Sequence, residues 1–370
     1  MAFAYLFKSG RKERIGNDTV GGPTEFFFGY PQLRESGLDV DLWQDNDFGL
    51  DKSPSRPWRT VNHLAWSALG LPLWATCRLA RRDARALLQG YDAVLVTTNT
   101  FGIALALLKC LGLCKPHLIF IAMGLVDFAT PKRILLMYRI VFRHVPLLSL
   151  GRPEVAFLKD RLPGIAIDYL PFGVDSRFWR PAGAAAETTP DGPYVLSIGN
   201  DRHRDYATLL RAWKPDYPQL KIVTKQQIPT ASIPANVTVI SGDWHQQMLS
   251  DEQIRTLMQR ALFVVLPILD TIQPSGQSTC LQAMACGKVV IISDIQGIWD
   301  RDLIRNDENC RLVPPESIAG LQAAIERSLG NAAACARLGT RARQTVERVL
   351  NIDALSARIA HLLNAIPGRS

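Results

Sequence analysis

The stretch FVVLPILDTIQPSGQSTCLQAMACGKVVIISD, residues 263–294, contains a complete strand, loop, helix and strand. Phe263–Leu266 and Val289–Ser293 are short apolar runs, and the helical run Cys280–Cys286 lies between them. Continuous apolar runs of this length are typical of parallel strands whose two faces are both covered by helices. The stretch therefore predicts a βαβ unit of a parallel sheet.

The same alternation of strands and helices extends along the whole chain. We expect further strands at Leu38–Trp43, Ala93–Thr97, His117–Ala122 and Asp168–Leu170 in the first half, and at Tyr194–Ile198, Leu220–Val223 and Val237–Ile240 in the second. Strands that alternate with helices favour parallel sheets. The predicted fold class is α/β, with two Rossmann-like, doubly wound domains.

The length of 370 residues predicts about two domains, because single cores stop growing at about 250 to 300 residues. Residues 171–193 are rich in Pro, Gly and Ala without an apolar period, as in a linker. We expect a first domain over residues 1–172, a second over 173–350 with residues 173–193 as linker, and a C-terminal helix over 351–370 that packs back on the first domain.

The net charge is +8, of which +6 lies in residues 1–172, so this half should attract phosphates or anionic headgroups. Seven cysteines without a CxxC pair fit neither a disulfide framework nor a zinc ribbon. The first residues lack the pattern of a secretory signal, and the longest apolar stretch, Leu64–Cys77, is too short to span a bilayer. These features predict a cytoplasmic protein.

The loop between the two strands of residues 263–294 is the first candidate site. Ser275, Gly276, Gln277, Ser278 and Thr279 lie where this loop enters the helix. A helix N-terminus binds anions through its unpaired N–H groups and its dipole. The alternative is an ordinary helix cap by Ser275 or Ser278.

A second candidate is YVLSIGNDRHRDYATLLRAW, residues 194–213, which predicts a strand, a glycine turn and a helix. Arg202, His203 and Arg204 lie in the turn, and an arginine binds a diphosphate through two parallel hydrogen bonds. The alternative is a solvated basic loop. A third, weaker candidate is GNDTVGGPTEFFFGY, residues 16–30, whose Gly21 and Gly22 allow close approach of a ligand or form a plain turn.

The order of these motifs resembles glycosyltransferase family 4, whose members have the GT-B fold of two Rossmann-like domains across a cleft that binds a nucleotide sugar. The family's glycine-rich loop matches Gly21-Gly22, its NGVDxxxFxP segment matches PFGVDSRFWRP from Pro171, its KGxxxLL stretch matches RDYATLL from Arg204, its LEAMACGxPVVxxDxGGI matches LQAMACGKVVIISDIQGI from Leu281, and its DGxNGxLVPP matches NDENCRLVPP from Asn306.

The resemblance implies a retaining transfer of a sugar from a UDP- or GDP-linked donor to a glycan or lipid-linked acceptor, without a cofactor or a metal ion. The role in cell-envelope polysaccharide biosynthesis belongs to the same implication. Arg204 takes the place of the lysine that neutralises the leaving diphosphate. Asn200 replaces the arginine that usually accompanies it, and we interpret Arg202 as the second charge. The implied donor-binding residues are Gly21, Gly22, Gly199, Asn200, Gln273, Ser275, Gly276, Gln277, Ser278, Thr279 and Gln282.

The chain departs from the family at its E-x7-E motif, where Pro274 and Gln282 stand in place of the two glutamates. Gln282 still forms hydrogen bonds to a ribose, whereas the first glutamate is replaced only by the neighbouring Gln273 or Gln277. A histidine that the family often has after the fourth strand is also missing. Asp127, just beyond, is a candidate for contacting the acceptor or the sugar, with a capping aspartate as the alternative.

The basic first half predicts peripheral contact with an anionic membrane surface. No acidic residue occurs from Phe128 to Pro153, and Ile134, Tyr138, Val141 and Val145 share a helical face that Arg139 and Arg143 avoid. A second basic cluster, Arg78, Arg81, Arg82 and Arg85, follows Trp66 and Trp74. The alternative is that these helices only cover the sheet.

Three other functions compete with catalysis by a glycosyltransferase. The replacement at Pro274 favours a catalytically weakened GT-B protein that binds a nucleotide sugar or a partner enzyme. A nucleic-acid binder lacks support, since no basic patch interleaved with aromatic residues occurs. An epimerase of the same fold is disfavoured by the matches at Leu281 and Asn306.

Overall fold

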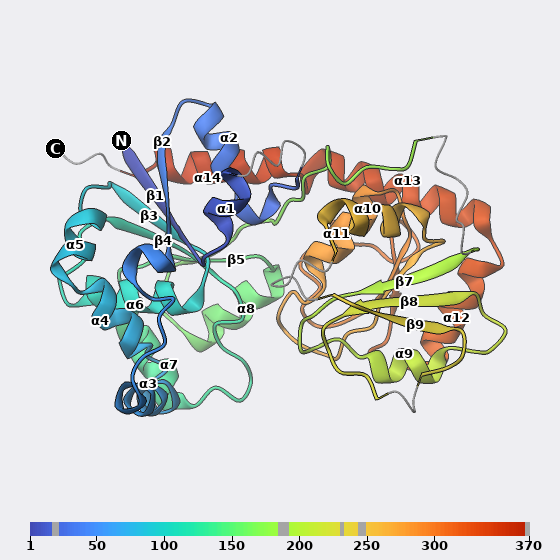
Figure 1. The fold of residues 1–370 in the computed structure, drawn as a ribbon, viewed down its shortest axis with the longest axis horizontal. Helices are drawn as coiled ribbons and strands as arrows, with labels where there is room; N and C mark the ends of the chain where they lie inside the picture. The colour runs from blue at the N-terminus through green and yellow to red at the C-terminus, as the bar shows by residue number, and fades with distance from the viewer. Residues whose placement is uncertain (17–21, 184–191, 230–232, 243–248, 367–370) are drawn as a thin grey trace. The chain divides into compact units, whose positions relative to one another are not determined.

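The computed structural model describes residues 1–16, 22–183, 192–229, 233–242 and 249–366. The chain divides into two compact units (Figure 1). The first comprises Met1–Val20, Phe27–Pro171 and Leu355–Ser370, and the second comprises Gly21–Phe26 and Phe172–Ala354. The main change of unit falls next to the boundary predicted at residue 172, but the short segment 21–26 belongs to the second unit.

The first unit contains a six-stranded parallel sheet with the order β2-β1-β3-β4-β5-β6. Its strands are β1 (Ala2–Phe7), β2 (Asp39–Gln44), β3 (Ala93–Val96), β4 (His117–Ala122), β5 (Leu147–Ser149) and β6 (Ile167–Tyr169). In the register, Ala4 of β1 lies opposite Asp41 of β2 and Val94 of β3. The helices of this unit are α1 (Arg11–Gly16), α2 (Tyr30–Glu35), α3 (Arg56–Leu69), α4 (Leu73–Leu79), α5 (Arg82–Leu88), α6 (Asn99–Cys110), α7 (Lys132–Val141), α8 (Arg152–Arg161) and most of α14 (Ile352–Asn364).

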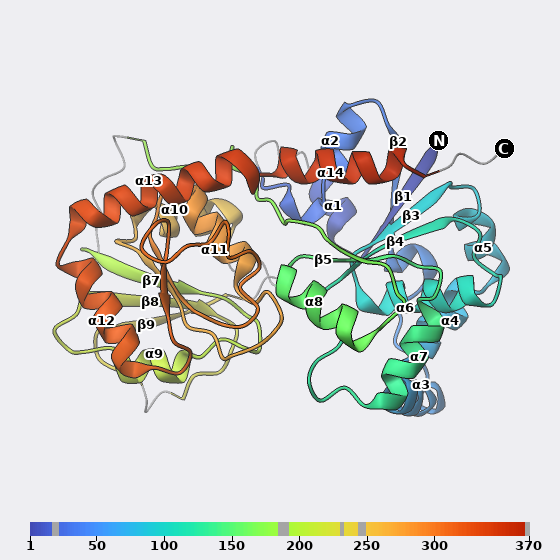
Figure 2. The same ribbon diagram turned by 180° about the vertical axis from the view of Figure 1, so that it is seen from behind.

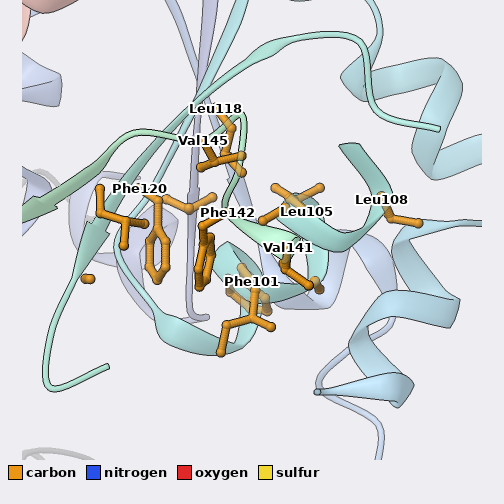
Figure 3. Packing of buried hydrophobic residues seen from close by; sticks show 14 of the residues in the cluster. Phe101, Leu105, Leu108, Leu118, Phe120, Val141, Phe142 and Val145 are labelled. Atoms are coloured by element: carbon orange, nitrogen blue, oxygen red, sulfur yellow. The ribbon is translucent and has the colours of Figure 1, made fainter. Parts of the chain in front are cut away.

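The core of the first unit lies between the sheet and helices α6 and α7, as Figure 3 shows. Phe120 of β4 stacks against Phe142 with ring centroids 5.8 Å apart. Gly102 of α6 lies directly over Phe120, and a Cβ atom at this position would collide with the ring. The apolar runs of the strands are therefore buried between helices, as parallel sheets require.

The second unit also contains a parallel sheet of six strands, with the order β12-β11-β10-β7-β8-β9. The strand order reverses between β7 (Tyr194–Ile198) and β10 (Val264–Leu266), so the connections after these two strands run in opposite directions. Ligands of open α/β sheets bind at such a switch point, beyond the carboxyl ends of the strands. The other elements are β8 (Gln219–Thr224), β9 (Val237–Ser241), β11 (Val290–Ser293), β12 (Arg311–Val313), α9 (Tyr206–Ala212), α10 (Asp251–Arg260), α11 (Gln277–Ala285), α12 (Ile318–Leu329) and α13 (Ala332–Val349).

The predicted α/β class is confirmed, and each of the nine predicted strands corresponds to an observed one. Three strands were missed. β1 is a buried run at the very start of the chain, which was considered only as a leader, and β5 and β12 have only three residues each. The C-terminal helix expected over residues 351–370 corresponds to α14, which begins after Asn351, and most of α14 belongs to the first unit.

The stretch predicted as a linker is partly packed. Val174 accepts the N–H of Ile352 at 2.9 Å and donates its own to Leu350 at 2.9 Å, and Trp179 is fully buried. Residues 173–179 of the expected linker are therefore packed, because the isolated aromatic residues Phe178 and Trp179, like the preceding Phe172, are buried in the second unit without any regular period. Residues 184–191 of the predicted linker lie outside the described residues.

Candidate functional site

The loops that follow β7 and β10 are joined to each other at the switch point of the second sheet. The backbone N–H of Leu269 donates to the carbonyl of His203 at 2.8 Å, and the N–H of Asp205 donates to the carbonyl of Pro267 at 3.0 Å. The two sequence motifs that we considered separately therefore form one site.

Arg204 lies at the centre of this site, with only 2% of its side chain exposed. Its Nε is 3.0 Å from Asp201 Oδ2, and its Nη2 donates to Thr279 Oγ1 at 3.4 Å. Its Nη1 is buried and has no hydrogen-bond partner among the described residues. Because an unsatisfied buried cation is costly, this nitrogen is suited to receive an anionic ligand.

Two glycines make room for the guanidinium. A Cβ atom at Gly199 would collide with Arg204 Nε, and one at Gly276 would lie 3.1 Å from Nη1 and 2.6 Å from Ile268 Cδ1. Gly276 also has a φ of 77°, in the left-handed region that favours glycine. These predicted residues therefore line the space around Arg204.

Helix α11 begins beside Arg204 without a side-chain cap. Its N-cap is Gly276, and no side chain accepts a hydrogen bond there. The alternative reading of Ser275 or Ser278 as an ordinary cap is therefore wrong. Because the first N–H groups of a helix carry the positive end of its dipole, the helix adds to the positive potential at Arg204.

His203 and Ser275 connect the two loops through their side chains, with His203 Nδ1 and Ser275 Oγ 3.0 Å apart. Burial lowers the pKa of His203, and the positive charge of Arg202 lowers it further, whereas Asp201 acts in the opposite direction. Arg202 is exposed, unlike Arg204. The imidazole is thus held in its neutral form more firmly than a free histidine.

The side chain of Asn200 is engaged with the backbone of neighbouring loops. Its Nδ2 donates to the carbonyl of Gly242 at 2.7 Å, and its Oδ1 accepts the N–H of Lys225 at 2.7 Å. Asn200 therefore joins the loops after β7, β8 and β9. Its predicted contact with a donor stays a prediction.

Gln282 lies one turn of α11 beyond Thr279, and its side chain meets a carboxylate that the sequence analysis missed. Glu25 Oε1 accepts hydrogen bonds from Gln282 Nε2 at 2.9 Å and from Trp179 Nε1 at 2.8 Å. Glu25 Oε2 accepts the backbone N–H of Asp175 at 3.3 Å. Glu25 is completely buried, and this burial raises the pKa of its carboxyl group.

The remaining predicted residues have different surroundings. Gln273 and Ser278 are half-buried and Gln277 is 5% exposed, all at or next to the start of α11. Gly22 is half-buried, whereas Gly21 lies outside the described residues. Asp127 belongs to the first unit, where its Oδ1 accepts a hydrogen bond from Thr130 Oγ1 at 2.9 Å within a local turn.

Within the described ranges, no group of three or more His, Cys, Asp or Glu side chains is arranged to hold a metal ion. A helix that is long and apolar enough to cross a membrane is likewise absent from these residues.

Comparison with known proteins gives one family match. Residues 193–331 match the family model described as "Glycosyl transferases group 1". This range contains Arg204, α11 and Gln282. No curated protein matches the sequence.

Solved structures with a similar fold cover almost the whole chain. Sucrose-phosphate synthase from Thermosynechococcus elongatus is 17% identical over 98% of both chains, with a TM-score of 0.72. A glycosyltransferase from Rickettsia africae is 13% identical over 100% of this chain and 99% of its own, with a TM-score of 0.70. HepE from Anabaena, in complex with UDP and glucose, is 14% identical over 99% and 100%, with a TM-score of 0.68.

The chain therefore has the GT-B fold of these solved glycosyltransferases, and residues 193–331, within the second unit, are similar to the glycosyl transferases group 1 family.

Proposed function

We propose that the protein transfers a sugar, with retention of anomeric configuration, from a nucleotide-sugar donor to a glycan or lipid-linked acceptor. The observation that carries the proposal is the buried, partly unsatisfied guanidinium of Arg204 beside the uncapped start of α11. This combination is suited to a diphosphate, which takes two parallel hydrogen bonds from arginine and further ones from helix N–H groups. In this proposal the second unit binds the donor and the first unit binds the acceptor.

Arg204 is the central group of the proposed mechanism. As the bond between the anomeric carbon and the phosphate oxygen breaks, negative charge develops on the leaving diphosphate, and Arg204 and the α11 N–H groups stabilise it. The exposed Arg202 adds a second positive charge. These groups do the work of a bound cation, and we therefore propose that transfer needs no metal ion.

Retention follows if the acceptor attacks from the face that the diphosphate leaves. The new bond joins the acceptor oxygen to the anomeric carbon, the diphosphate takes both electrons of the broken bond, and the acceptor proton moves to a diphosphate oxygen. Positioning then accounts for most of the catalysis, which agrees with the lack of a carboxylate at Pro274. Gln273 and Gln277, at the start of α11, are the proposed contacts to the sugar.

Uridine diphosphate is the first ligand to test, because the similar structure of HepE was determined with UDP and glucose. We would titrate the protein with UDP, GDP, ADP and dTDP, and then with the sugar conjugates of any ligand that binds. Arg204→Ala should weaken binding by about 10- to 100-fold, because the lost charge-assisted hydrogen bonds contribute about 1.5 to 3 kcal/mol to the binding free energy.

Arg211→Ala is the matched control, because Arg211 lies in the last turn of α9 and its Nη2 donates only to Thr208 Oγ1 within that helix. The control should bind as the wild type does. Absence of binding by any nucleoside diphosphate would contradict the proposal. Binding without hydrolysis of the donor or transfer to a membrane extract would favour the alternative of a catalytically weakened protein.

We further propose that the first unit contacts an anionic membrane surface through α3 and α7, which pack against each other (Figure 2). Arg133 of α7 donates to the carbonyls of Ala68 and Ser67 at 2.8 and 3.1 Å. Helix α3 has no buried residue, although it is amphipathic. The exposed apolar side chains of the pair are Trp58, Val61, Leu64, Trp66, Leu69, Leu136 and Ile140.

The charge around these side chains favours lipid headgroups as the partner. Residues 52–82 and 128–153 contain no acidic residue, and Arg139 and Arg143 are exposed, as predicted. Tyr138 and Val141 form the buried face of α7 as expected, while Val145 lies beyond the end of the helix. The second predicted cluster contributes less, because Arg78 donates to the carbonyl of Gly49 and is half-buried.

Vesicle binding tests this surface. The protein should sediment with vesicles of phosphatidylglycerol and phosphatidylcholine, less so as salt rises, because exposed charges are screened. Leu64→Ser should reduce binding, whereas Leu262→Ser, at an exposed leucine of the second unit, should not. Equal binding of both variants, or binding insensitive to salt, would contradict the proposal.

A further inference from the structure

The pair formed by Glu25 and Gln282 is not used in the proposed transfer, although both side chains are buried and Gln282 lies on the helix that begins beside Arg204. Both side chains belong to the second unit, although 257 residues separate them in the sequence. Glu25 is 0% and Gln282 4% exposed. An ionised carboxylate only accepts hydrogen bonds, so this contact turns the NH₂ end of the Gln282 amide toward Glu25 and leaves the amide oxygen facing away from it.

The position of Gln282 on α11 connects this pair to the donor site. Thr279, whose hydroxyl accepts from Arg204, precedes Gln282 by three residues, so the two side chains are neighbours on one face of the helix. If the phosphates of a nucleoside diphosphate lie at Arg204, a ribose that lies along α11 comes next to Gln282.

We propose that Glu25 is a positioning residue for the nucleotide: it holds the NH₂ group of Gln282, so that the amide oxygen of Gln282 accepts a hydrogen bond from a ribose hydroxyl. This inference rests on the proposed function. According to this inference, Glu25 in the segment 21–26 affects how tightly the second unit binds the donor.

The proposal also explains why residue 282 is an amide. A glutamate at this position would place a second negative charge beside the buried carboxylate of Glu25, and like charges in a buried site are strongly unfavourable. Glu25 and Gln282 together provide one carboxylate and one oriented acceptor oxygen. Glu25, from another segment of the chain, then supplies the carboxylate that residue 282 lacks, so the amide at 282 does not imply a loss of function.

The rest of the contact is rigid enough to hold Glu25 in place. Trp179 Nε1 donates to the same oxygen, Oε1, and Trp179 is fully buried. Thr24 Oγ1 donates to Asp175 Oδ2 at 3.0 Å, while the N–H of Asp175 donates to Glu25 Oε2. Glu25 is thus fixed from two sides before it meets Gln282.

Removing the acceptor tests the proposal through the affinity for UDP, with GDP as a second probe, and through the melting temperature. Glu25→Met should weaken nucleotide binding about five- to tenfold, because no oxygen remains to hold the NH₂ group of Gln282. Trp179→Phe removes the other hydrogen bond to Oε1, so it should lower the melting temperature but leave the affinity for UDP nearly unchanged. Gln282→Glu should lower both the affinity and the melting temperature.

Gln282→Met provides a second route if Gln282→Glu does not fold. It removes the acceptor, so it should weaken binding in the wild type but have much less effect in the Glu25→Met background. Glu326→Gln is the matched control, because Glu326 is a carboxylate of the second unit that pairs with Lys214 and Tyr217. This control should bind UDP normally.

The outcomes separate the two proposals. If the wild type binds a nucleoside diphosphate, but Glu25→Met binds it equally well or the effects of the two positions simply add, Glu25 only anchors its segment and this inference is overturned. If the wild type binds none of the nucleoside diphosphates, the proposed function fails and this inference fails with it. A loss of affinity in Trp179→Phe as large as that in Glu25→Met would also contradict a positioning role, because it would follow from destabilisation alone.

Discussion

The carboxyl ends of the two parallel sheets differ in how their polar groups are satisfied. In the first unit, Gln44 Oε1 accepts the backbone N–H groups of Arg11 and Lys12 at 2.6 and 2.9 Å. The buried Glu154 accepts from Ser149 Oγ at 2.6 Å and from the N–H of Gly124 at 2.9 Å. These groups are used to fix loops of the first unit.

In the second unit, Arg204 is buried with two nitrogens, Nε and Nη1, that have no hydrogen-bond partner among the described residues, although Nε is 3.0 Å from Asp201 Oδ2. The neighbouring helix α11 begins at a glycine and without a side-chain cap. At the first edge, Thr98 Oγ1 before α6 is also buried without a hydrogen-bond partner among the described residues, and α6 has no side-chain cap either. The two edges therefore differ in that the second holds a buried cation, and we regard this charge, rather than the sheet itself, as the mark of the ligand site.

The largest expected effect comes from filling the space beside Arg204. Gly276→Val should lower the free energy of unfolding by about 1 to 3 kcal/mol and abolish UDP binding, because it forces a branched residue to φ 77° and against Ile268 and Arg204. Chemical denaturation and UDP titration measure the two effects. Gly183→Val, where a Cβ atom meets nothing within 4 Å, should leave both unchanged. Similar effects of both variants would remove the special role of the α11 start.

A smaller effect sharpens the role of the guanidinium. Arg204→Lys keeps the positive charge but loses the planar pair of donors, so the affinity for UDP should fall about tenfold. Titration calorimetry against the wild type measures this difference. An unchanged affinity would show that charge alone suffices at this edge.

The fold was predictable from the sequence because strands and helices each leave a local pattern, a short apolar run or a helical spacing, that neighbouring residues show. The candidate site was predictable in part, since the turn with Arg204 and the start of α11 each follow a recognisable strand. The contact between these two loops was not predictable, because it depends on the strand order, which places β7 beside β10.

Glu25 illustrates what the sequence alone does not show. Its contact with Gln282 spans 257 residues, and its own neighbourhood suggests only a turn. The one local signal was an acidic residue directly before three phenylalanines, which is unusual at a surface. The packed aromatic residues after Pro171 were missed for the same reason, since burial at irregular spacing leaves no period.

A change in the first unit tests the other side of the comparison. Asp127→Ala should leave UDP affinity unchanged and lower the free energy of unfolding by about 1 kcal/mol, because Asp127 forms only a local turn with Thr130 among the described contacts. UDP titration and urea denaturation measure these two quantities. A loss of UDP affinity would place a donor-binding residue in the first unit, which we assign to the acceptor.

The smallest expected effect concerns pH. Because the pKa of His203 is lowered in the folded protein, the unfolded chain binds more protons below a pH of about 6.5, and the free energy of unfolding should decrease as the pH falls through this range. Bound UDP should oppose this decrease, since a phosphate favours the protonated imidazole. Melting temperatures of the wild type and His203→Gln, with and without UDP, measure the difference. Identical pH profiles would show that His203 does not face the ligand.

The most direct test of the central claim is a crystal structure of the protein with UDP. We expect the diphosphate within hydrogen-bond distance of Arg204 Nη1 and of the first backbone N–H groups of α11, with the ribose at Gln282. A diphosphate bound elsewhere, with Arg204 Nη1 still unpartnered, would contradict the account.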